Sequence, residues 1–176
     1  MTDLLLKQVR VIDPKGPQNC NTVDILIKAG RIVKIGNRIP KGDATEIRVE
    51  GLHASPGWVE TRARFHEPGE EWKQGLRNGL DAAAAGGFTA VAVLPSTHPA
   101  VDQRSSVEYL LHKGRGHGVR VLPIGALTKG LAGQQLAEHY DMQQAGAVAF
   151  SDDTHPVRNS RLMLLALQYV KNFGGR

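Results

Sequence analysis

The sequence predicts an α/β protein in which a small β-module precedes a parallel sheet of strand-then-helix units. Short alternating apolar segments fill the first fifty residues, whereas apolar runs alternate with helix-period segments beyond residue 56. Hydrophobic residues at 41% and charged residues at 22% are ordinary globular usage, which argues against disorder of the whole chain. Aromatic residues contribute only 5%, so small aliphatic side chains must build the core, which suits packed strand and helix layers.

The amino-terminal module, residues 1–55, is expected to be a small antiparallel sheet of the β-sandwich type. Residues that set turns separate its apolar segments, and Ala29-Gly30 is the clearest hairpin. The expected strands are Leu4–Ile12, Val23–Ile27, Arg31–Ile35 and Glu46–Val49.

Residues 56–176 are expected to form four strand-then-helix units with a parallel sheet. The expected strands are Gly57–Thr61, Phe88–Leu94, Arg120–Ala126 and Ala147–Phe150. The expected helices are Trp72–Ala85, Arg104–Lys113, Gly133–Ala145 and Ser160–Phe173.

Charge and cysteine content narrow the function classes. The net charge of +5 would permit nucleic-acid binding, but the densest basic run, residues 112–120, has no interleaved aromatic residues, so nucleic acid is not the expected partner. The single cysteine, Cys20, excludes an intrachain disulfide and fits a reducing compartment. No apolar run approaches the ~18 residues of a membrane span, and the chain opens without a signal-peptide pattern. We therefore expect a cytoplasmic protein without membrane association.

Four segments together resemble the dihydroorotase family of cyclic amidohydrolases. Residues 55–60 read Ser-Pro-Gly-Trp-Val-Glu, close to the segment through which the family enters its first barrel strand. Residues 62–69, Arg-Ala-Arg-Phe-His-Glu-Pro-Gly, match a family segment that places two histidines one residue apart. Residues 83–97 are similar to the second strand, and residues 146–153, ending Ser-Asp-Asp, look like the fourth.

The resemblance implies a partial TIM-type (β/α) barrel, comprising the first four strand-helix units after the β-module. The 176 residues fall short of the roughly 250 that a complete eight-unit barrel needs. An open four-strand sheet would expose edges and an inner face. We therefore expect either a fragment of a longer chain or an oligomer in which two halves close the barrel.

The resemblance places Arg62 and Arg64 where the family holds its two metal-binding histidines. Side chains two residues apart on a strand share one side, so histidines at this spacing can both bind a metal. Guanidinium stays protonated and has no lone pair to donate, so two arginines would repel a divalent cation. No cofactor is expected, with zinc implied only if the protein is active. Taken alone, the arginines are structural or interface residues, or bind an anion.

The remaining site residues follow from the same resemblance. His66 stands at the position of the family's substrate-carboxylate arginine, and Ser96 at that of a substrate-binding asparagine. Asp152 and Asp153 match an aspartate pair that supplies a metal or active-site carboxylate in one branch of the family. An aspartate pair at a strand end is equally an ordinary turn or helix-entry signal.

The leading interpretation is a dihydroorotase-like protein of pyrimidine biosynthesis that has lost metal-dependent catalysis and acts as a non-catalytic partner of aspartate carbamoyltransferase. The first alternative is part of an active cyclic amidohydrolase that opens dihydroorotate, allantoin or a hydantoin, with His66, Asp152 and Asp153 as substitute ligands. The second is a basic nucleic-acid-binding module.

Overall fold

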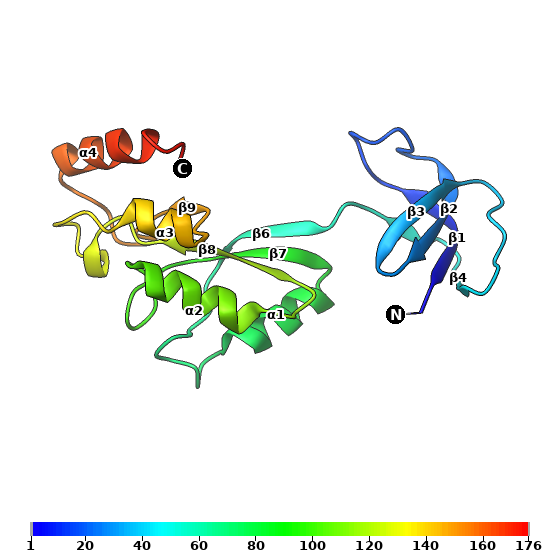
Figure 1. Cartoon of the computed structure of the whole chain (residues 1–176), viewed down its shortest axis with the longest axis horizontal. Coiled ribbons are helices and arrows are strands. Elements are labelled where there is room, and N and C mark those ends of the chain that lie inside the picture. The colour runs from blue at the N-terminus through cyan, green and yellow to red at the C-terminus, as the bar shows by residue number, and fades with distance from the viewer. Residues whose placement is uncertain (1, 176) are drawn as a thin grey trace. The chain divides into compact units, whose positions relative to one another are not determined.

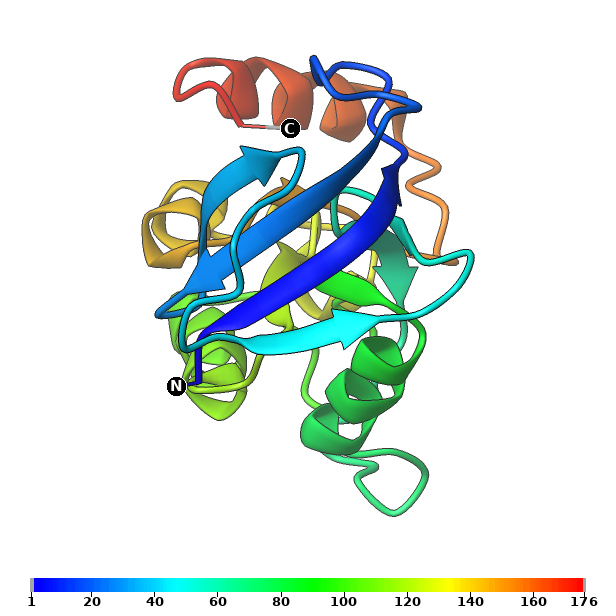
Figure 2. The same ribbon diagram turned by 90° about the vertical axis from the view of Figure 1, so that its right-hand side faces the viewer.

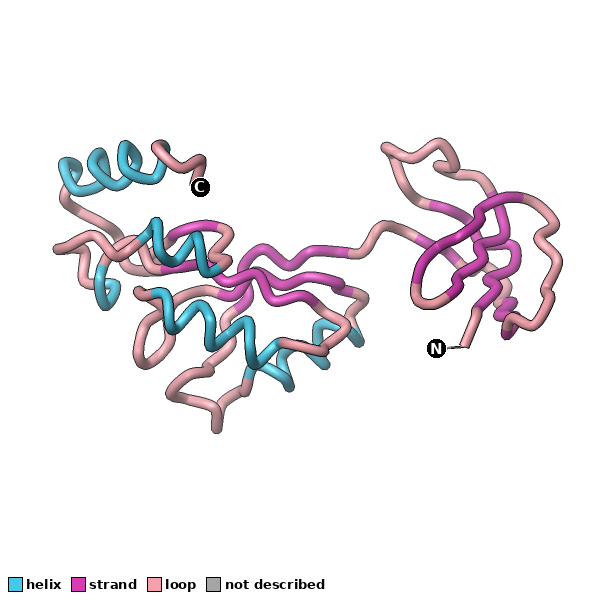
Figure 3. The backbone as a smooth tube through the Cα atoms, viewed as in Figure 1, coloured by secondary structure: helices cyan, strands magenta, loops and turns pink. Residues whose placement is uncertain are grey.

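A computed structural model describes residues 2–175, and the chain divides into two compact units between Pro56 and Gly57 (Figure 1). The amino-terminal unit is a β-module, and the carboxy-terminal unit alternates strands with helices (Figure 3).

The amino-terminal unit is one mixed five-stranded sheet (Figure 2). Strands β1 (Leu4–Val11), β2 (Thr22–Lys28) and β3 (Arg31–Gly36) pair antiparallel in sequence, as expected. Strands β4 (Thr45–Arg48) and β5 (His53–Ala54) both pair with β1 in parallel, so the expected all-antiparallel arrangement is wrong for them. The reason is the long return of residues 37–44, which carries the chain back to the start of β1. Within the described residues this unit has no second sheet of the kind that a sandwich requires.

Local interactions explain two features of this module. Ala29 and Gly30 both have positive φ angles, 48° and 74°, as the two central residues of a tight hairpin turn require. Asp24 is buried, and its carboxylate accepts hydrogen bonds from Lys7 Nζ at 2.7 Å and from the amides of Gln8 and Ile39. Burial would raise the pKa of Asp24, but these hydrogen bonds lower it overall.

The carboxy-terminal unit contains the four expected strand-helix units and confirms the predicted fold class. Its parallel sheet has the order β6 (Trp58–Ala63), β7 (Phe88–Val93), β8 (Arg120–Gly125), β9 (Ala149–Phe150). The helices are α1 (Leu76–Ala85), α2 (Arg104–Gly114), α3 (His139–Ala145) and α4 (Ser160–Lys171), with a 3-10 turn, η1 (Lys129–Leu131), after β8.

Alternating side chains give the sheet two different faces. Val91 and Val93 on β7 pack with Leu80 and Leu110 in the core beneath the helices. The intervening residues, Ala92 and the following Leu94, form a separate small cluster with Ile124, on the opposite face. That second face is the inner face of a curled half-barrel.

Two helices begin later than the sequence pattern predicts. Helix α1 starts at Leu76 instead of Trp72, because the Glu67 carboxylate accepts the Leu76 amide and ends the preceding loop there. Helix α3 starts at His139 instead of Gly133, since Gly133 has a positive φ of 70°, which a helix does not include, and Leu136 forms a β-bridge with Thr128.

Candidate functional site

Residues from the carboxyl ends of three strands converge at the mouth of the half-barrel. One Asp153 carboxylate oxygen accepts a hydrogen bond from Arg62 at 3.1 Å. The other accepts from Arg64 and, at 2.8 Å, from the Ser96 hydroxyl. Arg62 and Arg64 lie at the end of β6, Ser96 follows β7, and Asp153 follows β9. The structure therefore brings together four of the six residues that sequence analysis selected.

Local backbone geometry explains this convergence. Arg62 and Arg64 are two residues apart, so their side chains point to the same side. Asp153 adopts a left-handed φ of 54°, and its amide donates to the Ser151 hydroxyl at 3.0 Å. Its side chain is fully buried, whereas those of Arg62 and Arg64 are 64% and 44% exposed. The arginines thus cover a buried carboxylate from the solvent side.

The electrostatics of Asp153 follow from these contacts. Burial by itself would raise the pKa of Asp153, but the hydrogen bonds from Ser96, Arg64 and Arg62 outweigh it and lower the pKa below the ordinary value of 3.8. Asp153 is therefore ionised at neutral pH. Each of its two carboxylate oxygens therefore has a guanidinium partner.

The Asp152 side chain contacts the loop after β8 and not the two arginines. One of its carboxylate oxygens accepts the amides of Leu127 and Thr128, each at 2.8 Å, and the other accepts the Thr128 hydroxyl. Asp152 is buried, so these hydrogen bonds satisfy a desolvated carboxylate and fix the loop after β8. Asp152 thus has the contacts of a structural turn residue, whereas Asp153 pairs with Arg62 and Arg64. A catalytic role for either aspartate stays a prediction.

His66 lies outside the arginine–aspartate contacts. Its Nδ1 is 3.3 Å from Glu70 Oε2, and its amide donates to the carbonyl of Gln74. These contacts join the two sides of the loop that connects β6 to α1. The assignment of His66 to substrate binding remains a prediction.

The next residue, Glu67, has a role that sequence reasoning missed. It is buried and accepts hydrogen bonds from the Leu76 amide and Tyr109 hydroxyl, both at 2.7 Å, and from Lys113 Nζ at 2.8 Å. Burial would raise the pKa of Glu67, and the three donors lower it overall. No local sequence pattern predicts this network, because Tyr109 and Lys113 lie on α2 and are distant from Glu67 in the sequence.

His139 is a second residue that the sequence did not single out. It is completely buried, with Nε2 2.7 Å from the Leu127 carbonyl and the ring against Phe150 and Tyr169. Its Nδ1 has no hydrogen-bond partner among the described residues. Burial lowers the pKa of His139, so the ring is neutral at pH 7 and donates from Nε2. Its contacts support the structure beneath the mouth.

The donor set at the mouth does not fit a divalent metal. Two guanidinium groups and a hydroxyl surround one carboxylate, and guanidinium offers no lone pair. Across residues 2–175, no three His, Cys, Asp or Glu side chains gather closely enough to hold an ion. Nor is any helix of the described chain long and apolar enough to cross a membrane.

Solved structures share this fold. The L-hydantoinase (dihydropyrimidinase) of Arthrobacter aurescens superposes with a TM-score of 0.79 at 20% identity, over 99% of this chain and 40% of its own. A dihydroorotase superposes with a TM-score of 0.67 at 14% identity, over 99% of this chain and 50% of its own. The fold class is thus the first half of the TIM-type barrel found in such enzymes, with its β-module.

Sequence comparison defines the family. The family model described as dihydro-orotase-like matches residues 53–172. The dihydroorotase of Syntrophotalea carbinolica is 42% identical over 171 residues, and that of Aquifex aeolicus 38% identical over 176 residues. These alignments cover 97% and 99% of this chain but only 40% and 41% of the two relatives. The chain belongs to the dihydroorotase-like family and spans about 40% of the length of these relatives.

Proposed function

We propose that this chain is a dihydroorotase-like protein of pyrimidine biosynthesis that does not open cyclic amides and acts as a non-catalytic partner of aspartate carbamoyltransferase. The observation that carries the proposal is the pairing of Arg62 and Arg64 with Asp153. The family resemblance places metal-binding histidines at the two arginine positions, and a metal or active-site carboxylate of one branch of the family at the aspartate pair. In this chain Arg62 and Arg64 carry a permanent positive charge, and Asp153 forms ion pairs with both of them.

Electrostatics support the loss of metal binding. A divalent cation about 4 Å from one guanidinium is repelled by roughly 8 kcal/mol at an effective dielectric constant of about 20. Two arginines would approximately double that repulsion, and the attraction of the single Asp153 carboxylate would offset about one of them. Asp153 would also have to give up both arginines before it could coordinate the ion. Hydrolysis of a cyclic amide at neutral pH needs a metal-activated water, so a mouth that repels the metal removes the nucleophile.

The alternative, an active amidohydrolase with substitute ligands, requires His66, Asp152 and Asp153 to meet around one ion. Asp152 would have to leave three hydrogen bonds in a buried position, and His66 would have to leave Glu70. The contacts of these residues give this alternative no support.

The first test is zinc content, measured by elemental analysis of protein purified without chelator, together with a dihydroorotate ring-opening assay. We expect background zinc and no ring opening after zinc is offered and the excess removed. The matched control is the double variant Arg62→His, Arg64→His, which restores two lone-pair donors beside Asp153 and should gain zinc. About one zinc per chain in the unaltered protein would refute the loss of metal binding.

The partnership needs its own test. The unaltered chain is mixed with aspartate carbamoyltransferase from the same organism, and the mixture is followed by sedimentation velocity. A faster-sedimenting species that contains both proteins is expected. Independent sedimentation of the two proteins at micromolar concentrations would refute the partnership while leaving the metal result intact.

A further inference from the structure

The two arginines at the mouth carry more positive charge than their partner neutralises. Within residues 2–175, Asp153 is the one carboxylate that the Arg62 and Arg64 guanidinium groups contact, so two positive charges and one negative charge leave a net charge of +1. Glu60 does not balance this charge, because its carboxylate accepts the Arg62 backbone amide and lines the cavity beside α1. The surplus positive charge can attract an anion.

Most hydrogen-bond donors of the two guanidinium groups are also available. A guanidinium has five N–H donors, and each arginine uses one nitrogen, Nη2, to bind Asp153. Neither group donates to another acceptor among the described residues. The arginine side chains are 64% and 44% exposed, whereas the Asp153 side chain is fully buried. The available N–H groups therefore lie on the solvent side of the ion pairs.

Asp153 fixes the positions of both guanidinium groups. One of its oxygens accepts from Arg62 and the other from Arg64, so a single buried carboxylate orients the pair. The carboxylate is itself held by the Ser96 hydroxyl, which donates to it at 2.8 Å. Side chains that are ordered before a ligand arrives lose less conformational entropy on binding. The two arginines are thus preorganised to bind one ligand together.

We propose that Arg62 and Arg64 form a binding site for an oxyanion, a phosphate or carboxylate group, where the family resemblance places a metal ion. A guanidinium matches the oxygen geometry of both groups, and two neighbouring guanidinium groups can bind one oxyanion from two sides. The oxyanion would lie next to both arginines and farther from Asp153 behind them, so attraction outweighs repulsion. The site rests on the proposed loss of metal binding, because a metal ion would displace the arginines from Asp153.

The test is the binding of inorganic phosphate and of malonate to the 176-residue chain. Binding is measured by isothermal titration calorimetry at constant ionic strength in the presence of EDTA. We expect saturable binding of at least one of the two anions, with a Kd of about 1 mM or below. Tighter binding of phosphate would point to a phosphoryl ligand, and tighter binding of malonate to a carboxylate ligand. Arg62→Gln and Arg64→Gln should each weaken binding about tenfold or more.

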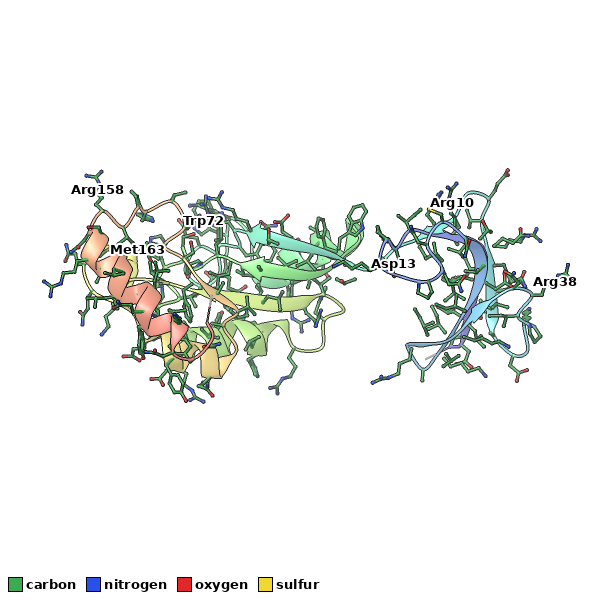
Figure 4. All side chains as sticks on the ribbon, turned by 90° about the horizontal axis from the view of Figure 1, so that it is seen from above. Arg10, Asp13, Arg38, Trp72, Arg158 and Met163 are labelled. Carbon is green, nitrogen blue, oxygen red and sulfur yellow. The ribbon has the colours of Figure 1, made fainter. Side chains whose placement is uncertain are left out.

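Arg158→Gln is the matched control. It removes the same charge from an exposed side chain that points away from the carboxy-terminal unit, so the affinity should not change (Figure 4). Both site variants keep one arginine on Asp153 and should retain the wild-type circular dichroism spectrum. Nitrogen NMR of the arginine side-chain N–H groups gives a second readout. The two signals that shift when the anion is added should be the two that are missing from the site variants.

Three outcomes would overturn the proposal. The first is the absence of saturable binding up to about 10 mM of either anion. The second is an equal effect of Arg158→Gln and the site variants, since the charge of the whole protein would then explain the attraction. The third is binding that occurs only without EDTA, because a metal would then hold the anion. Failure of the proposed function would appear as zinc in the elemental analysis, whereas failure of this proposal alone would leave zinc at background with no anion bound.

Discussion

Replacing Asp153 by asparagine removes the shared counter-charge of Arg62 and Arg64 while keeping the shape of the side chain. An amide also presents an N–H group where one carboxylate oxygen stood, so one guanidinium would face a donor instead of an acceptor. The perturbation therefore breaks charge pairing and hydrogen bonding at a buried point, without opening a cavity.

The magnitude lies between that of exposed and that of buried ion pairs. Exposed pairs contribute about 0–1 kcal/mol, and breaking a buried pair costs about 3–5 kcal/mol. Asp153 is fully buried, but the arginines are 64% and 44% exposed and remain partly hydrated, so we expect a loss of about 1–3 kcal/mol. The folded state lowers the pKa of Asp153, so its stabilisation is present above the ordinary value of 3.8 and disappears as the pH falls through the folded-state pKa.

The assay is urea unfolding at pH 7 and at pH 3, followed by circular dichroism and by the fluorescence of Trp58 and Trp72, both in the carboxy-terminal unit. The difference in the free energy of unfolding between wild type and Asp153→Asn should be smaller at pH 3 than at pH 7. Glu108→Gln, which breaks the exposed pair with Arg104, is the control and should cost less than about 0.5 kcal/mol. The reasoning would be refuted if Asp153→Asn lost no more stability at pH 7 than the control variant. It would also be refuted if EDTA lowered the stability of the wild-type protein by a similar amount, because a bound metal would then be the partner of Asp153.

Two further substitutions test the network beneath the mouth. Glu67→Gln should cost about 1–3 kcal/mol in urea unfolding, because one amide oxygen cannot satisfy the three donors that the buried carboxylate serves. The Lys113 side chain is 45% exposed, which reduces the cost below that of a fully buried pair, and a loss below about 0.5 kcal/mol would contradict the explanation. Burial lowers the pKa of His139, so the free energy of unfolding of the wild-type protein should decline as the pH falls below the ordinary value of 6.5. In His139→Gln this decline should be smaller. Parallel curves of unfolding free energy against pH for the two proteins would exclude the explanation.

Sequence patterns predicted the order of elements in the carboxy-terminal unit well, because a strand buried on both faces and an amphipathic helix have different apolar periods. They failed where long-range contacts decide the structure. The start of α1 depends on the Glu67 carboxylate, and the direction of β4 depends on where the chain returns after Ile39 becomes buried. Neither contact leaves a local signal.

The sequence predicted which residues lie at the candidate site, but not which of them form ion pairs with each other. The spacing of Arg62 and Arg64 placed both on one side, and the resemblance pointed to Asp153. An ion pair with Glu60 or Glu67 was equally compatible with the sequence. In the structure the Glu60 carboxylate accepts a hydrogen bond from the Arg62 backbone amide at 2.7 Å, and the Arg62 guanidinium donates to Asp153. Strand curvature decides between these partners, and curvature depends on the whole sheet.

Charge balance explains why arginines, and not apolar residues, suit these two positions. A fully buried carboxylate such as Asp153 needs compensating positive charge, and leaving it unpaired would cost several kcal/mol. A divalent cation supplies two positive charges, and two guanidinium groups supply the same number from within the chain. The barrel mouth can therefore keep its aspartate and its strand geometry without a metal, whereas one arginine replaced by leucine would leave the carboxylate underbalanced. Under the proposed loss of metal binding, these ion pairs would supply the charge that a divalent ion supplies where such an ion activates water for hydrolysis.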